Sequence, residues 1–404
     1  MEFNIYEWLN LVVRWIHVIF AIMWIGNSIF FNWLDNSFEP PKEEKDGVRG
    51  ELWMLHGGGF YLVEKRGLKP DQIPEILHWF KWESYGTWLS GLSLMIVVYY
   101  LQANVYMVNT SVANISSLTA VMIGLGTIVG GWLFYDTVFK LFGNKNTFPP
   151  IAICLVALIG LAYVLQLYIS GRSTYIHIGA LLGTCMSGNV FFHIIPRQKQ
   201  MMAATRAGSP PDEKLGQWAK NRSRHNNYMT FPVIFLMLSN HFPSTYGHKY
   251  NWLVLATLVA TSATIKHFMN ISDSFKSRGA YRASLITAVW VGGIMLYMLY
   301  GFPAKKTSVN TPGVKAPVVS FAKANAIIQK RCVPCHSKSS KNPVHAAVPK
   351  TSYMDTPAQI KKLATRIKVR SVDGKTMPLA NQTKMTDEER KLLGYWIQQG
   401  AKLK

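Results

Sequence analysis

The feature that most constrains this chain is a series of long apolar segments separated by polar stretches. A helix needs about 20 apolar residues to cross the roughly 30 Å hydrocarbon core of a bilayer. Eight segments approach that length: 9–32, 84–104, 116–141, 149–170, 173–195, 227–243, 250–269 and 282–302. Because a helix satisfies its own backbone hydrogen bonds in lipid, the sequence predicts an all-α membrane domain of about eight transmembrane helices over residues 1–302.

Lysine and arginine are unevenly distributed between the predicted loops. Most of them fall in 33–83, 142–148, 196–226 and 270–281. The opposite loops contain little more than Arg172 and Lys249. Since positive residues favour the cytoplasmic side of a membrane, we expect the basic loops in the cytoplasm and both termini outside. The first residues, MEFNIYEW, contain acids where a signal peptide would be basic, so the first helix itself is expected to direct insertion.

The positive charge is concentrated in the last quarter of the chain. The 404 residues include 43 Lys and Arg against 21 Asp and Glu, a net charge of +22, yet 49% of the residues are apolar. That combination excludes a disordered polycation, and we expect no nucleic-acid partner. Residues 303–404 alone contain 20 Lys and Arg against 5 Asp and Glu. The aperiodic stretch PAKKTSVNTPGVKAPVV indicates a linker over 303–319, followed by a small basic domain over 320–404.

A cysteine motif in this second domain is typical of haem attachment. Cys332 and Cys335 stand three positions apart, and His336 follows at once. In a c-type cytochrome the two thiols form thioether bonds to the haem, and the adjacent histidine ligates the iron. The alternatives are a zinc site or a thiol-redox pair, but zinc would need two further Cys or His ligands at matching spacing. We therefore expect one covalent haem c at this motif.

The sixth iron ligand is expected to be a methionine. Met377 is preferred because Pro378 stiffens its loop, and Met385 and then Met354 are the alternatives. Three helix-forming stretches accompany the motif: FAKANAIIQKR after Ser320, the segment from Thr356 to Ile367, and a last helix with a capping box of Thr386 and Glu389. A small all-α domain with histidine and methionine ligands indicates electron transfer at a fairly high potential.

Ionisable residues inside the apolar segments are candidates for chemistry because they are costly in lipid. Arg14 and His17 share one face of the first predicted helix. His193, Arg222 and His225 fall near the cytoplasmic ends of later segments. We take these five as the catalytic candidates, and a histidine is the natural base near neutral pH.

Each candidate also has a structural explanation. Arg222 and His225 can be solvated loop residues or lipid headgroup contacts, and His17 can make an interhelical hydrogen bond. His177 and His193 stand 16 positions apart, so a straight helix cannot direct both of them to one site. Histidines of the membrane domain could instead hold a second, non-covalent haem.

Several segments resemble the bacterial integral-membrane urate oxidases that are fused to cytochrome c. They are VRWIHVIFAIMWIGNSIFFNWLD, ELWMLHGGGFYLVEKR, GNVFFHIIPRQKQ, RHNNYMTFPVIFLMLSNHFP, RCVPCH and TMPLANQTKMTDEER. The resemblance covers 1–302 as the membrane domain and 320–404 as the cytochrome. It implies oxidation of urate to 5-hydroxyisourate in purine degradation, with electrons leaving through the cytochrome and no hydrogen peroxide formed. Its haem positions coincide with Cys332, Cys335, His336 and Met377, and it assigns no catalytic residue in the membrane domain.

The expected protein therefore crosses the bacterial inner membrane several times and carries its cytochrome on the periplasmic side. Its expected partners are urate, the lipid bilayer and a downstream cytochrome or terminal oxidase. Two other functions stay open. A membrane-anchored electron carrier for quinol or for another dehydrogenase predicts reduction by quinol and indifference to purines. A transporter or sensor predicts movement of substrate without chemical change.

Overall fold

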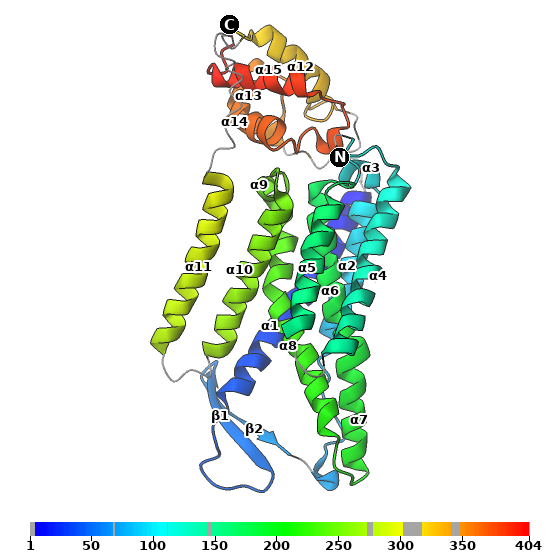
Figure 1. Cartoon of the computed structure of the whole chain (residues 1–404), viewed down its shortest axis with the longest axis vertical. Coiled ribbons are helices and arrows are strands. Elements are labelled where there is room, and N and C mark those ends of the chain that lie inside the picture. The colour runs from blue at the N-terminus through cyan, green and yellow to red at the C-terminus, as the bar shows by residue number, and fades with distance from the viewer. Residues whose placement is uncertain are drawn as a thin grey trace.

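The computed structural model describes residues 5–67, 69–110, 112–143, 148–272, 278–301, 317–340, 342, 348 and 350–403. The described chain is mostly helical and forms an elongated bundle with a small helical unit at one end (Figure 1). We call residues 317–403 the C-terminal unit. The expected linker lies outside the described residues except for 317–319.

Long helices run along the bundle (Figure 1). They are α1 (Ile5–Ser37), α2 (Trp82–Leu94), α4 (Ser117–Phe142), α5 (Phe148–Leu165), α6 (Gly171–Gly188), α7 (Ile195–Arg206), α8 (Glu213–Leu238), α10 (Asn251–Ser272) and α11 (Arg278–Gly301). The short helices α3 (Ala103–Tyr106) and α9 (Pro243–Tyr246) lie at the end next to the C-terminal unit. A π-helical stretch, Asn189–Ile194, joins α6 to α7, and another, Met95–Tyr100, follows α2. Both chain ends lie at the end that carries the C-terminal unit.

Within the described residues, five helical segments are long and apolar enough to cross a membrane. They are Ile5–Ser37, Ser117–Phe142, Phe148–Leu165, Gly171–Arg206 and Asn251–Asn270. The expected span 84–104 is divided between α2, a π-helical stretch and α3, and 227–243 is the apolar part of α8, which begins among charged residues. The expected span 282–302 falls in α11, whose side chains are only partly described. The five helices are compatible with a membrane protein, and eight crossings stay a prediction.

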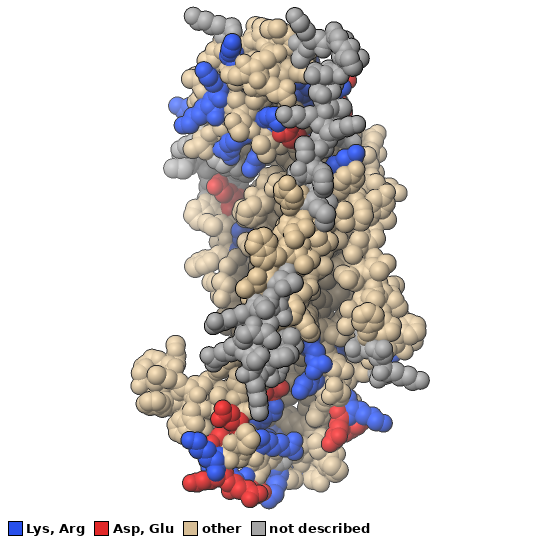
Figure 2. Space-filling model, turned by 60° about the vertical axis from the view of Figure 1, so that its left-hand side comes forward, with Lys and Arg blue, Asp and Glu red and all other residues tan. Residues whose placement is uncertain are grey.

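The surface of the bundle also suits a lipid environment. Figure 2 shows charged side chains gathered at the two ends of the molecule, with few between them. Large apolar side chains face outward along the bundle, among them Trp15, 66% exposed, and Val156, 71% exposed. An apolar surface of this extent is unusual for a monomer in water.

The all-α expectation is wrong in the first basic loop, where β1 (Val48–His56) and β2 (Gly59–Arg66) form an antiparallel hairpin. His56 pairs with Gly59 across the turn. Gly57 and Gly58 have φ angles of +59° and +81°, a region that glycine occupies without steric cost. The glycine run is therefore the turn of a hairpin at the end of the bundle opposite the C-terminal unit (Figure 1).

The core of the bundle lies where α6 packs against α4, α5 and α8, and where α10 packs against α5 and α8. Ile178, Leu236 and Leu255 are fully buried there. A Cβ atom at Gly124 of α4 would lie 2.3 Å from Nε2 of His177 on α6. The two helices can therefore approach at this level only because position 124 has no side chain.

The C-terminal unit folds around its own apolar core, which includes Ile328, Ile360, Leu393 and Trp396. Its helices are α12 (Phe321–Arg331), α13 (Pro357–Lys362), α14 (Ala364–Ile367) and α15 (Asp387–Gln398). The predicted capping box of α15 is confirmed by reciprocal hydrogen bonds between residues 386 and 389, of 2.8 and 3.2 Å. The middle segment forms two short helices rather than the single helix that was predicted.

Candidate functional site

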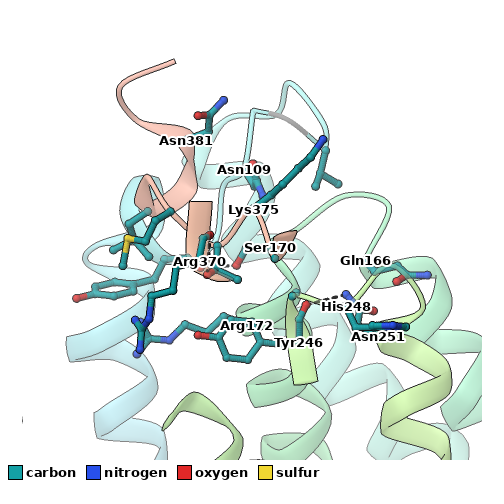
Figure 3. Close-up of a pocket in the computed structure, with 18 of the residues that line it drawn as sticks. Asn109, Gln166, Ser170, Arg172, Tyr246, His248, Asn251, Arg370, Lys375 and Asn381 are labelled. Atoms are coloured by element: carbon teal, nitrogen blue, oxygen red, sulfur yellow. Dashed lines mark hydrogen bonds between the residues drawn. The ribbon is translucent and has the colours of Figure 1, made fainter. Parts of the chain in front are cut away.

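The bundle and the C-terminal unit enclose a pocket where they meet, which we call the junction pocket (Figure 3). Its volume is about 580 Å³, which is within the range of small-molecule sites. The bundle wall comes from α3 and from the ends of α6, α9 and α10 nearest the C-terminal unit, and the other wall from residues 370–387. Polar lining residues include Asn109, Gln166, Arg172, Asn251, Arg370 and Lys375.

Arg172 is the principal cation of the bundle wall. It stands in the first turn of α6, which begins where Ser170 accepts a hydrogen bond from the amide of Ser173. Arg172 Nε donates to Asn240 Oδ1 at 2.9 Å, and the hydroxyl of Tyr99 donates to the same oxygen at 2.9 Å. The guanidinium also lies 4.8 Å from the ring centre of Tyr106. An amide and aromatic rings therefore fix this cation at the pocket.

Arg370 supplies a second cation from the C-terminal unit. It lies in the π-helical stretch Lys368–Asp373, and its carbonyl accepts hydrogen bonds from Met377 N at 2.9 Å and from Thr376 Oγ1 at 3.2 Å. Arg172 and Arg370 lie on the same side of the pocket (Figure 3). Burial raises the pKa of Tyr246, and the charges of both arginines oppose that rise, so both cations act on one hydroxyl.

The junction pocket is electropositive. Its acidic lining residue, Asp387, accepts a hydrogen bond from Lys375 Nζ at 2.6 Å, and this contact holds the pKa of Asp387 below its usual range. Among the residues that the structure describes, no carboxylate forms an ion pair with Arg172 or Arg370. Cations, amides and aromatic rings around a cavity suit a planar anion.

A second polar site lies inside the bundle, and we call it the inner network. Asp136 of α4 is its centre: one carboxylate oxygen accepts from His193 Nε2 at 2.6 Å and from Arg222 Nη2 at 3.0 Å, and the other accepts from Lys140 at 2.7 Å. Asp136, His193 and Arg222 are all buried. Arg197 donates to His193 Nδ1 at 3.2 Å, so the neutral ring carries its proton on Nε2.

Asparagine and tyrosine side chains extend the inner network toward the middle of the bundle. Asn189 donates to the hydroxyl of Tyr135 and to Asn226 Oδ1, both at 2.9 Å. The Tyr135 hydroxyl in turn contacts His225 Nδ1 at 2.8 Å. The guanidinium of Arg222 lies 5.2 Å from the Tyr135 ring. These bonds link α4, α8 and the π-helical stretch that follows α6, so the network holds helices together as well as positioning protons.

The structure separates the five catalytic candidates. His193, Arg222 and His225 come together in the inner network, whereas Arg14 and His17 lie apart from it on α1. Arg14 is exposed and donates to Asn10 at 2.8 and 3.1 Å. His17 Nδ1 contacts the Thr87 carbonyl and the Ser90 hydroxyl, both at 3.1 Å. His17 therefore makes the interhelical contact that was its structural alternative.

Sequence reasoning missed the carboxylate that organises the inner network. Asp136 is the one acidic residue of the apolar segment 116–141, and that isolation was a signal for function. Arg172 was treated only as a loop charge. No local pattern marks it or Arg370, because the junction pocket is assembled from segments about 200 residues apart.

The expected haem motif has a geometry that suits haem ligation. Cys332 ends α12, and the amides of Cys335 and His336 donate to its carbonyl at 3.1 and 2.9 Å. The two cysteines are not bonded to each other. His336 Nδ1 contacts the Ser352 carbonyl at 3.0 Å, which places the ring proton on Nδ1 and directs the basic lone pair to Nε2. Two thiols and an oriented imidazole are the donor set that a c-type haem requires.

The three methionine candidates occupy different positions. Met385 and Met354 are buried in the C-terminal unit, and Met377 is half-buried. Met377 and Met385 both line the junction pocket, whereas Met354 does not. Arg390 donates to the carbonyl of Met377 at 2.7 Å and so fixes its loop. Which of them would ligate iron stays a prediction. Within the described residues, no three His, Cys, Asp or Glu side chains are arranged to hold a metal ion.

Comparison with known proteins gives one finding about this chain. The family model described as "Urate oxidase N-terminal" matches residues 3–299. No curated protein and no solved structure matches the chain. The matched range includes the bundle wall of the junction pocket and the whole inner network, and it ends before the C-terminal unit.

Proposed function

The chain belongs to the urate oxidase N-terminal family, and from that membership we propose that it oxidises urate at the junction pocket and passes the electrons to haem c. In this proposal Cys332 and Cys335 hold the haem covalently, and His336 and Met377 ligate its iron. The protein would span the bacterial inner membrane, with the C-terminal unit on the periplasmic side.

One observation carries the proposal: the junction pocket has one wall from the family domain and the other from the loop that contains Met377. Urate is a planar anion near neutral pH. The guanidinium of Arg172 offers paired donors to its oxygens, and the amides of Gln166 and Asn251 offer both donors and acceptors to its ring edges. A substrate held there would lie directly against the C-terminal unit.

The proposed reaction adds water to urate and gives 5-hydroxyisourate, two protons and two electrons. Oxygen is not consumed, so no hydrogen peroxide forms. When bound, haem c would accept these electrons one at a time. The described residues would hold the anion in a fixed orientation and limit the water around it. Water would then attack urate in one geometry.

The inner network is a less suitable place for this chemistry. It lies on the α7 side of the bundle, away from the C-terminal unit, and a bilayer core between the two ends is roughly 30 Å thick. Electron tunnelling weakens steeply with distance, so oxidation there would need a carrier within the bundle. A second, non-covalent haem is the carrier that the sequence suggests, and a pyridine haemochrome assay that finds only haem c would exclude it.

The test is an anaerobic titration of the purified, oxidised protein in detergent. Urate is added while haem absorption, urate loss and peroxide are followed together. The proposal expects two moles of haem reduced for each mole of urate lost, and no peroxide. If urate has no effect while a quinol reduces the haem, the protein is an electron carrier. If urate is consumed while the haem stays oxidised, the proposed electron path is wrong.

A further inference from the structure

We propose that Arg370 is a substrate-binding residue, so that urate bridges the bundle and the C-terminal unit across the junction pocket. This inference rests on the proposed function and deepens it. The bundle would supply Arg172, the C-terminal unit would supply Arg370, and the site would be complete only when the two parts are docked.

Arg370 lies where it can contact a ligand that Arg172 also binds. Arg172 and Arg370 come from different parts of the molecule and lie on the same side of one cavity (Figure 3). Within the described part of the chain, neither forms an ion pair with a carboxylate. Two like charges facing one cavity repel each other, and an anion between them removes that repulsion. Urate has oxygen and nitrogen acceptors next to each other around its rim, so two guanidinium groups on one side of the cavity can both donate to one molecule.

Within the described residues, the side chain of Arg370 has no hydrogen-bond partner of the kind that Arg331 and Arg390 have. Arg331 makes paired hydrogen bonds to Glu389 of 2.9 to 3.0 Å, and Arg390 donates to the carbonyls of Ser371 and Met377. Those side chains hold the unit together. The backbone of Arg370 is fixed by Met377 and Thr376, while its half-buried side chain extends to the pocket.

Arg370 is linked directly to Met377, the proposed iron ligand. The amide of Met377 donates to the Arg370 carbonyl at 2.9 Å. An anion bound by Arg370 therefore contacts a residue whose carbonyl is hydrogen-bonded to Met377. Substrate binding and docking of the C-terminal unit are therefore coupled. Electron transfer is limited to protein molecules that have bound substrate and are docked.

The inference is tested by binding without turnover. The haem of the full-length protein is first reduced with ascorbate under argon, so that urate cannot be oxidised, and radiolabelled urate is then measured by equilibrium dialysis. The variants are R370Q, R370K and, as a control of equal charge change, R366Q, since Arg366 is exposed and does not line the pocket. Loss of a charge-assisted hydrogen bond predicts about tenfold weaker binding for R370Q, a partial recovery for R370K and no change for R366Q. In turnover, R370Q should raise KM more than it lowers kcat.

The possible outcomes separate the bridging role of Arg370 from the proposed function. If R370Q binds urate as R366Q does while wild type turns urate over, the bridging role is wrong and the proposed function stands. If wild type binds urate and R370Q does not, but urate never reduces oxidised haem, the bridging site stands and the oxidation is wrong. If wild type neither binds nor oxidises urate, both are wrong. Haem absorption of each variant shows whether the C-terminal unit is folded.

Discussion

At the scale of single residues, Arg172 is the side chain on which the proposed urate site most depends. Its replacement by glutamine keeps a donor for Asn240 and removes the charge. A hydrogen bond to a charged group contributes about 1.5–3 kcal/mol, so we expect R172Q to lower kcat/KM for urate by roughly 10- to 100-fold. K249Q is the matched control, because Lys249 is an exposed cation at the same end of the bundle. Equal kinetics for the two variants would contradict the proposed site.

The inner network predicts a loss of stability rather than a specific loss of binding. D136N leaves the buried guanidinium of Arg222 without its anionic partner, and removal of one member of a buried ion pair costs about 3–5 kcal/mol. The double variant D136N/R222Q removes both charges and should be less destabilised than D136N alone. Thermal unfolding in detergent measures the difference. Abolished urate turnover at unchanged stability would instead place the catalytic site in the inner network.

At the scale of helices, the contact between α12 and α15 predicts a dependence on acid. Burial alone would raise the pKa of Glu389, but hydrogen bonds from Arg331 and from the Thr386 amide hold it below its usual range. A carboxylate whose folded pKa is depressed contributes stability that is present above its unfolded pKa of about 4.3 and is lost as the pH falls through the folded value. We therefore expect α15 to open progressively below about pH 4.

Hydrogen–deuterium exchange of α15 amides, compared between variants at each pH, checks this expectation. In R331Q the difference in protection between pH 6 and pH 3.5 should be smaller than in wild type, since the group that depresses the pKa is gone. R366Q, which removes an exposed charge of the same unit, should behave as wild type does. A steep acid response in R331Q would show that another carboxylate is responsible.

The helices were more predictable than the sites, because a helix depends on nearby residues and a site depends on segments that are far apart in the sequence. Apolar length placed α1, α4 and α5, and the Thr386–Glu389 pattern placed the start of α15, because each signal is local. The β1–β2 hairpin was not predicted, because the runs LWML and FYLV beside the glycines are continuously apolar and lack the alternation that indicates a half-buried strand. The junction pocket could not be predicted, because nothing in the sequence around Arg172 shows that residues 370–387 will pack against it.

At the scale of the whole molecule, the C-terminal unit touches the bundle through a place that only glycine allows. A Cβ atom at Gly247, just after α9, would lie 2.6 Å from Thr376 Cγ2 and 3.0 Å from the Gly374 carbonyl oxygen. It would also lie 2.7 Å from the Pro243 carbonyl oxygen within the bundle. The contacts with Thr376 and Pro243 are too short for a real Cβ atom, so a side chain at position 247 must displace its neighbours. A shift of residues 374–376 would draw the C-terminal unit away from the junction pocket.

We therefore expect G247A to slow haem reduction by urate severalfold while leaving reduction by ascorbate unchanged, because only the first reaction needs the docked arrangement. T376S removes the methyl group nearest to the new side chain and keeps the hydroxyl that bonds to the Arg370 carbonyl. The double variant G247A/T376S should regain part of the rate, and this recovery separates a clash between the two parts from the local clash with Pro243. G183A is the control, since a Cβ atom there meets nothing within 4 Å. If G247A reduces its haem with urate as fast as G183A does, electrons do not cross at this contact, and the junction pocket is not where urate is oxidised.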